Sequence, residues 1–279
     1  MKGGSLAARI RAEVARDVKE LGRVGLATVL VGDDPASHVY VTRKHEAAEE
    51  VGISSADHRL PADIDAEDLH ALLTELNLAG EVDGILVQLP LPAHLDESVV
   101  LRTVSPIKDV DGFHPFNRGL LSLGRPTFVP ATPLGIMTLL HEHDVRIEGA
   151  HAVVVGRSEI VGKPVALLLL AEHATVTICH SRTPDLARFT RDADVLVAAV
   201  GKAGLITVEM VKEGSAVVDV GINRTETGIV GDVDAAVTER AGLVTPVPGG
   251  VGPMTIAMLL RNTVQAARYR RNPVAFPAS

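Results

Sequence analysis

The sequence predicts an α/β protein of two domains. Its 279 residues are close to twice the length of about 150 residues that is common for one domain. Short apolar runs alternate with amphipathic helical patterns, an order that is typical of parallel sheets built from βαβ units. Glycine and proline gather between Pro90 and Pro133 and separate two such runs. We therefore expect a first domain over residues 1–133, a second over 134–253, and a C-terminal helix (254–279) that packs back onto the first.

The individual elements follow from the periodicity of the apolar residues. In the first domain we expect helices over Ser5–Leu21, Val39–Val51 and Asp65–Asn77, and strands over Leu26–Val31 and Gly84–Gln88. In the second we expect strands over Ala152–Val155, Thr175–Cys179, Val195–Ala199 and Ala216–Val220, with a helix over Pro164–Ala171. A further helix over Met254–Arg270 follows the second domain and is the one expected to pack onto the first. The last residues, NPVAFPAS, have the composition of a frayed tail.

Composition excludes several classes of function. The net charge is −8 and aromatic residues make up 3% of the chain, without tryptophan, so a basic surface or stacking platform for nucleic acid is not expected. The single cysteine, Cys179, cannot form an internal disulfide, which favours a reducing, cytoplasmic compartment. Residues 1–25 offer no apolar signal core. The uncharged stretch Ala241–Leu260 contains several prolines and glycines, so we expect a loop entering a helix and no membrane segment.

A nucleotide site is predicted where the strand HAVVV ends. Gly156 follows this strand, and Gly162 precedes a helix that has Pro164 in its first turn. Glycines let the backbone approach a pyrophosphate, and the free N–H groups of the helix start attract the anion. Because the spacing is not GxGxxG, a plain strand–turn–helix remains the alternative.

The next strand indicates which nucleotide. It is followed by His180, Ser181, Arg182 and Thr183, and the first carboxylate comes only at Asp185. An acidic residue here usually binds the ribose 2′-hydroxyl of NAD, whereas arginine accommodates the 2′-phosphate of NADP. Arg157 adds a second cation. We predict NADP, with a solvated basic patch as the alternative. The loops AVGKAG and DVGIN also follow strands and fit the same crevice.

Catalytic candidates occur in the first domain. Tyr40 and Lys44 are four residues apart and share one face of a helix; a desolvated lysine can act as a general acid or base, although a charged, solvated helix face is the alternative. Gln88 ends an apolar strand, so a buried partner is expected. Asp109 and Asp111 lie beside Gly112; a carboxylate can bind two donors of an amino-pyrimidinone ring, and a turn-forming aspartate is the alternative.

Seven motifs together carry a family resemblance: YVTRK, GILVQLPLP, KDVDGFHPFN, VVVGRSEIVGKP, CHSRT, DVGIN and TPVPGGVGPMTIAMLLRNT. Over about residues 5–268 the chain resembles the bifunctional methylenetetrahydrofolate dehydrogenase/cyclohydrolase family. The resemblance implies an N-terminal three-layer α/β domain, a Rossmann-like NADP-binding domain, a folate cleft between them, and a homodimer. It implies oxidation of 5,10-methylenetetrahydrofolate with NADP, then hydrolysis to 10-formyltetrahydrofolate, as part of one-carbon metabolism and purine biosynthesis.

The resemblance also implies roles for individual residues. Lys44 matches the catalytic lysine, Tyr40 the tyrosine that packs on the substrate, Gln88 the glutamine that tunes the lysine, and Asp111 the carboxylate that binds the pterin. The remaining matches are cofactor contacts at Gly156, Arg157, Ser158, Ser181 and Ile222, to which the charge argument adds Arg182, and a loop beside the substrate at Pro248, Gly249 and Gly250.

The sequence departs from the family in a few places, and two other functions stay open. Glu46 stands where members have a more basic run, and Ala131 where many have cysteine. A dehydrogenase with impaired cyclohydrolase activity is one alternative, and a non-catalytic nucleotide-binding sensor is the other. No metal is expected, because the methenyl cation is already electrophilic; HEH at 141–143 is interpreted as an exposed helix end.

Overall fold

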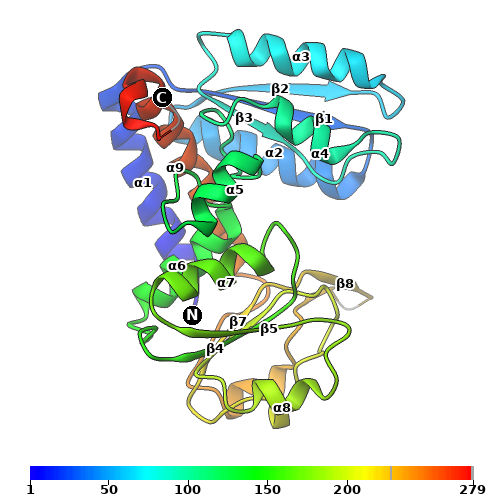
Figure 1. Cartoon of the computed structure of the whole chain (residues 1–279), viewed down its shortest axis with the longest axis vertical. Helices are drawn as coiled ribbons and strands as arrows, with labels where there is room; N and C mark the ends of the chain where they lie inside the picture. The colour runs from blue at the N-terminus through cyan, green and yellow to red at the C-terminus, as the bar shows by residue number, and fades with distance from the viewer. Residues whose placement is uncertain (227, 278–279) are drawn as a thin grey trace. The chain divides into compact units, whose positions relative to one another are not determined.

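The computed structural model describes residues 1–226 and 228–277 (Figure 1). The chain divides into two compact units. One contains Arg9–Val129 and Leu259–Ser279, and the other contains Met1–Ala8 and Pro130–Met258. We call them the lysine unit and the glycine-loop unit, after the candidate residues that each holds.

The lysine unit is an α/β unit around a parallel sheet. Its elements are α1 (Gly4–Leu21, from Arg9), α2 (Pro35–Glu50), α3 (Ala66–Leu78), α4 (Glu97–Thr103), α5 (Pro115–Ser122), the end of α9 (Val251–Arg271), η3 (Pro273–Ala275), and strands β1 (Gly25–Val31), β2 (Ser54–Leu60) and β3 (Gly84–Val87). The strand order is β2-β1-β3, with both pairs parallel. Helix α3 lies on one face of this sheet and α2 on the other (Figure 1).

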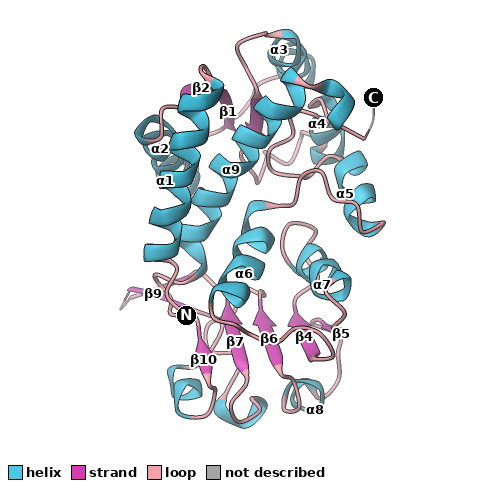
Figure 2. Cartoon of the chain, turned by 90° about the vertical axis from the view of Figure 1, so that its left-hand side faces the viewer, coloured by secondary structure: helices cyan, strands magenta, loops and turns pink. Residues whose placement is uncertain are grey.

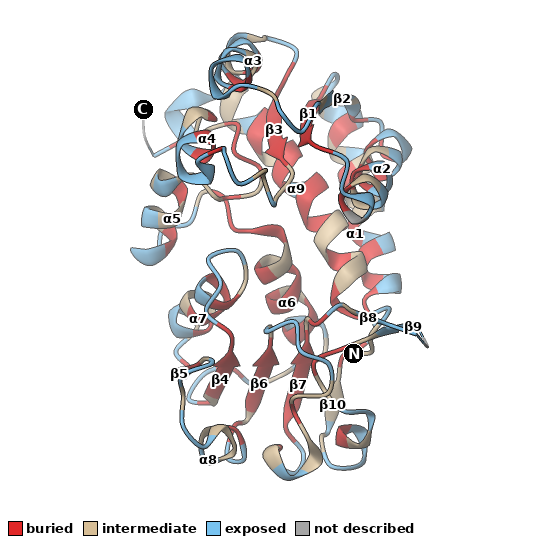
Figure 3. Ribbon diagram, turned by 90° about the vertical axis from the view of Figure 1, so that its right-hand side faces the viewer, coloured by how far each residue is buried: buried red, intermediate tan, exposed pale blue. Residues whose placement is uncertain are grey.

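Apolar side chains of β1 and β3 pack against α3 and α4. Leu69 and Leu73 of α3 are fully buried beside Val29 of β1 and Ile85 of β3. Every residue of β1 and β3 is buried (Figure 3), as expected for strands covered on both faces.

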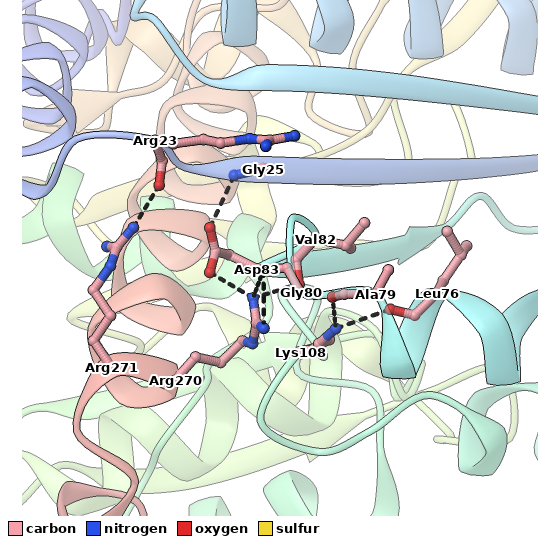
Figure 4. Close-up of polar contacts among 10 residues, drawn as sticks. All are labelled: Arg23, Gly25, Leu76, Ala79, Gly80, Val82, Asp83, Lys108, Arg270 and Arg271. Carbon is pink, nitrogen blue, oxygen red and sulfur yellow. Dashed lines mark hydrogen bonds and ion pairs between the residues drawn. The ribbon is translucent and has the colours of Figure 1, made fainter.

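Ionic contacts fasten the C-terminal helix to this sheet (Figure 4). The guanidinium of Arg270 donates to Asp83 at 2.7 Å and to the carbonyl of Val82 at 2.7 Å, and Asp83 also accepts from the backbone N–H of Gly25 at 2.9 Å. Nearby, the buried ammonium of Lys108 donates to the carbonyls of Leu76 and Ala79, at the end of α3. These carbonyls lack helical partners, so Lys108 caps the helix.

The glycine-loop unit contains a five-stranded parallel sheet in the order β10-β7-β6-β4-β5 (Figure 2). Its elements are α6 (Ala131–Glu142), β4 (His151–Val155), α7 (Gly162–Ala171), β5 (Thr175–Cys179), α8 (Leu186–Thr190), β6 (Val195–Ala198), η1 (Val208–Met210), β7 (Ala216–Asp219), β8 (Asn223–Thr225), β9 (Gly228–Val230), η2 (Ala235–Glu239), β10 (Leu243–Val244) and the first part of α9. In chain order this sheet is 2-1-3-4-5, a doubly wound arrangement whose switch point lies between β4 and β6.

Most predicted elements are confirmed, and several were missed. The predicted strand Thr175–Cys179 matches β5, and the helix expected over Ser5–Leu21 matches α1 within one residue. The stretch expected to be loop-rich holds α4, α5 and the start of α6. Helix α6 ends at Glu142 with His143 as its C-cap, which confirms HEH as a helix end.

The expectation of a frayed tail is wrong for the described part of the C-terminus. The side chain of Phe276 is 3% exposed and lies among Phe116, Phe128 and Tyr269, with ring centroids 5.8, 6.3 and 5.2 Å away. Burial of an aromatic ring stabilises by roughly 1.5–3 kcal/mol, which offsets part of the conformational entropy lost when this segment becomes ordered.

Among residues 1–226 and 228–277, no helix combines the length and apolar character needed to cross a membrane.

Candidate functional site

A buried lysine is the centre of the candidate site in the lysine unit. Helix α2 is capped by Asp34, the residue before its first, whose carboxylate accepts from the Ser37 N–H at 2.8 Å and from the Ser37 hydroxyl at 2.7 Å. Such caps stabilise a helix start by about 1 kcal/mol. From this fixed start, Tyr40 and Lys44 project one turn apart, with Lys44 Nζ 4.8 Å from the centroid of the Tyr40 ring. Only 6% of Lys44 is exposed.

Gln88 is the hydrogen-bond partner of this lysine. It follows directly after β3, and its Oε1 accepts from Lys44 Nζ at 3.1 Å. Its Nε2 donates to the carbonyl of Leu89 at 2.7 Å. The buried partner that the polar strand end predicted is therefore Lys44, and the structure brings Tyr40, Lys44 and Gln88 together.

The two aspartates of the KDVDGFHPFN segment have different environments. Asp109 is buried, and its carboxylate accepts from the N–H groups of Phe113 and His114, at 3.1 and 2.8 Å, and from Asn117 Nδ2 at 2.8 Å. Asp111 is half-buried, and no described residue donates a hydrogen bond to it. Asp109 thus fixes the loop, and Asp111 keeps its acceptors available for a ligand.

Burial and mutual charge shift the pKa values of Lys44 and Asp111. Burial lowers the pKa of Lys44, and the charge of Asp111 partly offsets this shift. Burial raises the pKa of Asp111 to about 6; Lys44 opposes this increase and Asp109 adds to it. A lysine with a lowered pKa beside a carboxylate is suited to proton transfer near neutral pH.

The predicted glycine loop lies at the switch point of the parallel sheet. Gly156 has a φ of 123°, a conformation that favours glycine. A Cβ at Gly156 would lie 2.2 Å from the carbonyl oxygen of Ala199, and one at Gly162 would lie 2.3 Å from the carbonyl oxygen of Gly156. The two glycines let the loops after β4 and β6 and the start of α7 meet backbone to backbone, as a dinucleotide site requires.

The polar residues of this loop and its neighbour are exposed. Ser158 Oγ accepts from the N–H groups of Val161 and Gly162, both at 3.2 Å, and so caps the start of α7. Arg157, Ser181 and Arg182 are exposed. The 180–183 turn is fixed by the N–H of Arg182, which donates to His180 Nδ1 at 3.2 Å. The exposed guanidinium groups of Arg157 and Arg182, in the glycine loop and in the turn after β5, suit a ligand that carries several phosphates.

The remaining predicted residues also belong to the glycine-loop unit. Ile222, after β7, is 62% exposed. Pro248 and Gly249 are exposed in the loop before α9, and the Gly249 carbonyl accepts from the N–H of Gly3 at 2.9 Å. The N–H of Gly250 donates to the Pro246 carbonyl at 2.8 Å.

Two residues that organise these sites were not among those predicted from the sequence. Asn117, in the lysine unit, is fully buried and bridges Asp109 and the carbonyl of Pro106. Asp232, in the glycine-loop unit, is also fully buried. A signal was present in each case, because Asn117 ends the quoted KDVDGFHPFN motif and Asp232 follows a glycine directly after a short strand.

Family comparisons cover most of the chain. Residues 1–111 match the catalytic domain of the tetrahydrofolate dehydrogenase/cyclohydrolase family, and residues 130–271 match its NAD(P)-binding domain. The bifunctional protein FolD of Geobacillus thermodenitrificans is 57% identical over 274 residues, which is 96% of each chain. FolD of Moorella thermoacetica is also 57% identical over 274 residues, 96% of this chain and 98% of the relative.

Solved structures agree with this result. The bifunctional FolD enzyme of Campylobacter jejuni, a methylenetetrahydrofolate dehydrogenase/cyclohydrolase, has a TM-score of 0.95 at 49% identity and covers 96% of this chain and 98% of its own. FolD of Trypanosoma brucei, solved with NADP cofactor and an inhibitor, has a TM-score of 0.93 at 39% identity and covers 98% of both chains. The chain therefore belongs to the tetrahydrofolate dehydrogenase/cyclohydrolase family.

Proposed function

We propose that Lys44 moves the protons in the hydrolytic step of a two-step reaction on a folate substrate. The chain is an NADP-dependent methylenetetrahydrofolate dehydrogenase and methenyltetrahydrofolate cyclohydrolase. It converts 5,10-methylenetetrahydrofolate to the methenyl cation and then to 10-formyltetrahydrofolate. The observation that carries the role of Lys44 is its buried ammonium, 3.1 Å from Gln88 Oε1.

The cofactor side of the reaction rests on the glycine loop. Bound NADP supplies the hydride acceptor. We assign Gly156 to the close approach of its pyrophosphate, because Gly156 follows β4 at the switch point of the sheet. Arg157, Ser158, Ser181 and Arg182 are assigned to its phosphates. Ile222 is assigned to a nonpolar contact with the cofactor. For the oxidation the protein's main task is to hold the substrate carbon against the acceptor in a reactive geometry.

The hydrolysis requires two proton transfers that one lysine can perform. The neutral amine of Lys44 takes a proton from the water that adds to the cationic carbon. The resulting ammonium then protonates N5 of the folate as the bond between this carbon and N5 breaks, and the hydroxyl proton leaves to solvent as the formyl C=O forms. A pKa lowered by burial keeps the neutral amine accessible for the first transfer.

Binding of the folate is assigned to the residues around this lysine. Asp111 has unused acceptors that suit the two adjacent N–H donors of the pterin, in a bidentate pair. The ring of Tyr40 is assigned to packing on the flat substrate. Pro248, Gly249 and Gly250, which belong to the glycine-loop unit, are assigned to a second contact with the substrate. In this proposal the folate-binding domain spans 1–133 with 254–279, and the NADP domain spans 134–253.

The setting of the enzyme is part of the same proposal. We propose a cytoplasmic homodimer that binds neither nucleic acid nor membrane. The free, buried thiol of Cys179 and the net charge of −8 support a reducing compartment and argue against a polyanionic partner. Light scattering of the purified protein tests the dimer.

A paired absorbance assay tests the function. It follows NADPH and methenyltetrahydrofolate together after addition of 5,10-methylenetetrahydrofolate, with NAD in a parallel reaction. NADPH that rises without accumulation of the methenyl compound supports both activities. If methenyltetrahydrofolate instead accumulates and disappears only at the rate of its spontaneous hydrolysis, the lysine site does not catalyse hydrolysis. No reduction of either nucleotide would favour a nucleotide-binding sensor.

Glu46 does not favour the alternative with impaired hydrolysis. It is exposed and two residues from Lys44, and residues two apart on a helix do not face each other. The charged group that shifts the pKa of Lys44 is Asp111.

A further inference from the structure

Two buried carboxylates occur side by side at the end of β7, in the glycine-loop unit. Asp219 is 4% exposed and Asp232 is 0% exposed. Their carboxylates are satisfied by N–H groups: Asp219 accepts from the backbone of Gly221, Asp232 and Val233 at 2.9, 2.9 and 3.0 Å. Burying a charge costs free energy unless hydrogen bonds compensate it. Two buried carboxylates side by side therefore indicate a specific role for these groups.

Asp232 binds the loop that follows β6. Its Oδ2 accepts from the N–H groups of Val200 and Gly201 at 2.7 and 3.0 Å, and its Oδ1 accepts from the N–H of Lys202 at 2.8 Å. Three successive N–H groups that converge on one anion resemble the backbone concavities that bind phosphates. Here the protein's own carboxylate fills that concavity, so these donors are not available to a nucleotide.

Asp232 also holds the loop that follows β7. Its Oδ1 accepts from Asn223 Nδ2 at 2.9 Å, directly after Ile222, an assigned cofactor contact. A Cβ at Gly221 would lie 2.3 Å from Asp232 Oδ1, and one at Gly231 would lie 1.7 Å from Asp219 Oδ2. Both glycines are required because the carboxylates occupy the space of a side chain.

A chain of close contacts leads from Asp232 to the glycine loop. Asp232 fixes residues 200–202, and Ala199 immediately precedes them. The carbonyl oxygen of Ala199 is only 2.2 Å from the position that a Cβ of Gly156 would take, so residue 156 must be a glycine. Strands β6 and β4, which these residues follow, are neighbours in the sheet. The position of Asp232 is thus transmitted to the switch point by backbone packing.

We propose that Asp232 is a positioning residue for the NADP site: it fixes the loops after β6 and β7 in the shape that receives the cofactor. This inference rests on the proposed function. Asp232 itself touches loop N–H groups, and its effect on the reaction passes through Ala199, Gly156 and Ile222.

The test is Asp232→Asn, with Asp234→Asn as the matched control. Asn keeps the size of the side chain but turns an NH₂ group toward backbone N–H groups. Asp234 is two residues away and exposed, and it caps η2 by accepting from the Ala236 N–H at 2.8 Å.

We expect Asp232→Asn to raise the KM for NADP by about tenfold or more, which is the scale of a lost charge-assisted hydrogen bond. The KM for 5,10-methylenetetrahydrofolate and the rate of methenyl hydrolysis, which needs no NADP, should stay within about twofold of wild type. Asp234→Asn should leave all three unchanged.

The results separate a positioning role from a structural one. If the KM for NADP is unchanged in Asp232→Asn, or if methenyl hydrolysis falls equally, the inference is overturned. If the variant does not fold, Asn223→Ala decides, since it removes one bond to Asp232 and should raise the KM for NADP severalfold; an unchanged KM there would overturn the inference. Failure of wild-type protein to reduce NADP would instead refute the proposed function.

Discussion

Lys44 and Gln88 form a hydrogen bond of 3.1 Å between Nζ and Oε1, across 44 residues of sequence. The other end of the Gln88 amide donates to the Leu89 carbonyl at 2.7 Å, and this second bond fixes which atom of the amide faces the lysine. Because an amide oxygen only accepts, it serves both the neutral amine and the ammonium of Lys44. Gln88 can therefore hold the lysine in place while its protonation state changes.

Replacement of the lysine should separate the two activities. Lys44→Met removes the proton carrier but keeps an unbranched side chain in the buried site. We expect methenyl hydrolysis to fall by about 10²- to 10⁴-fold, the usual contribution of general acid–base catalysis, while part of the hydride transfer remains. Single-substrate assays of each step measure this split. Arg43→Met, at the exposed neighbouring position, should leave both rates unchanged, and equal survival of both activities in Lys44→Met would remove Lys44 from the mechanism.

A charge at position 88 should move the pH profile of hydrolysis upward. In Gln88→Glu a carboxylate replaces the amide 3.1 Å from Lys44 Nζ, and an opposite charge at this distance favours the ammonium and raises the lysine pKa. Since the neutral amine takes the first proton, a higher pKa shifts the acidic limb of kcat for hydrolysis to higher pH. The profile from pH 6 to 9, corrected for spontaneous hydrolysis, measures this shift. A limb at its wild-type position would show that a group other than Lys44 limits the rate.

Local periodicity predicted most helices and strands but not the elements that depend on distant contacts. Strand β2, SSADHRL, alternates between exposed and half-buried residues and lacks the apolar pattern of a buried strand. It forms because β1 offers it a complete parallel register. Phe276 likewise has no local signal and is ordered by the ring of Tyr269, seven residues earlier, and by two rings from a distant part of the chain, Phe116 and Phe128.

The candidate site shows the same division. Helical spacing placed Tyr40 and Lys44 on one face, and the polar end of an apolar strand predicted a buried partner for Gln88. Periodicity does not identify Lys44 as that partner; the family resemblance implied it, and the structure shows the hydrogen bond between the end of β3 and α2. The difference between Asp109 and Asp111 depends on which carboxylate the loop N–H groups reach, and the spacing of the two residues does not indicate it.

Asp111→Asn should weaken folate binding and leave cofactor binding intact. The amide loses one acceptor and the negative charge of a bidentate pair, so we expect the KM for 5,10-methylenetetrahydrofolate to rise by about tenfold or more. The KM for NADP should stay within about twofold of wild type.

Asp111→Asn also removes the charge that raises the pKa of Lys44, so the acidic limb of the pH profile of hydrolysis should move to lower pH. Asp65→Asn, at an exposed position without a side-chain cap bond, is the control. An unaltered folate KM would reject the pterin contact.

Because of Lys108, the free energy of unfolding should increase with pH in the alkaline range. Burial and the charge of Arg270 lower the pKa of Lys108 from its ordinary 10.5 to about 8. Between these values the unfolded chain binds more protons than the folded one, so the free energy of unfolding rises with pH, by up to about 1.4 kcal/mol per pH unit. Below pH 8 the cost of burying the ammonium is fully present. Urea unfolding of wild type and Lys108→Met at several pH values should show a difference that changes in this window, and parallel curves would contradict the shifted pKa.

The charges after β5 should decide between the two nicotinamide nucleotides. Arg182 is exposed, and its backbone N–H donates to His180, so the turn carries an exposed cation next to Ser181 in sequence. A guanidinium binds a 2′-phosphate bidentately, and only NADP carries this group. We expect the pair Ser181→Ala and Arg182→Leu to lower the ratio of kcat/KM for NADP to that for NAD by about tenfold to a hundredfold, mainly by raising the KM for NADP. Higher salt should weaken NADP binding to wild type more than to the double variant, because an exposed ion pair is screened. Arg188→Leu, an exposed arginine on α8, is the matched control and should preserve the preference. An unchanged ratio in the double variant would assign these residues to the solvated surface and leave Arg157 to provide the selectivity.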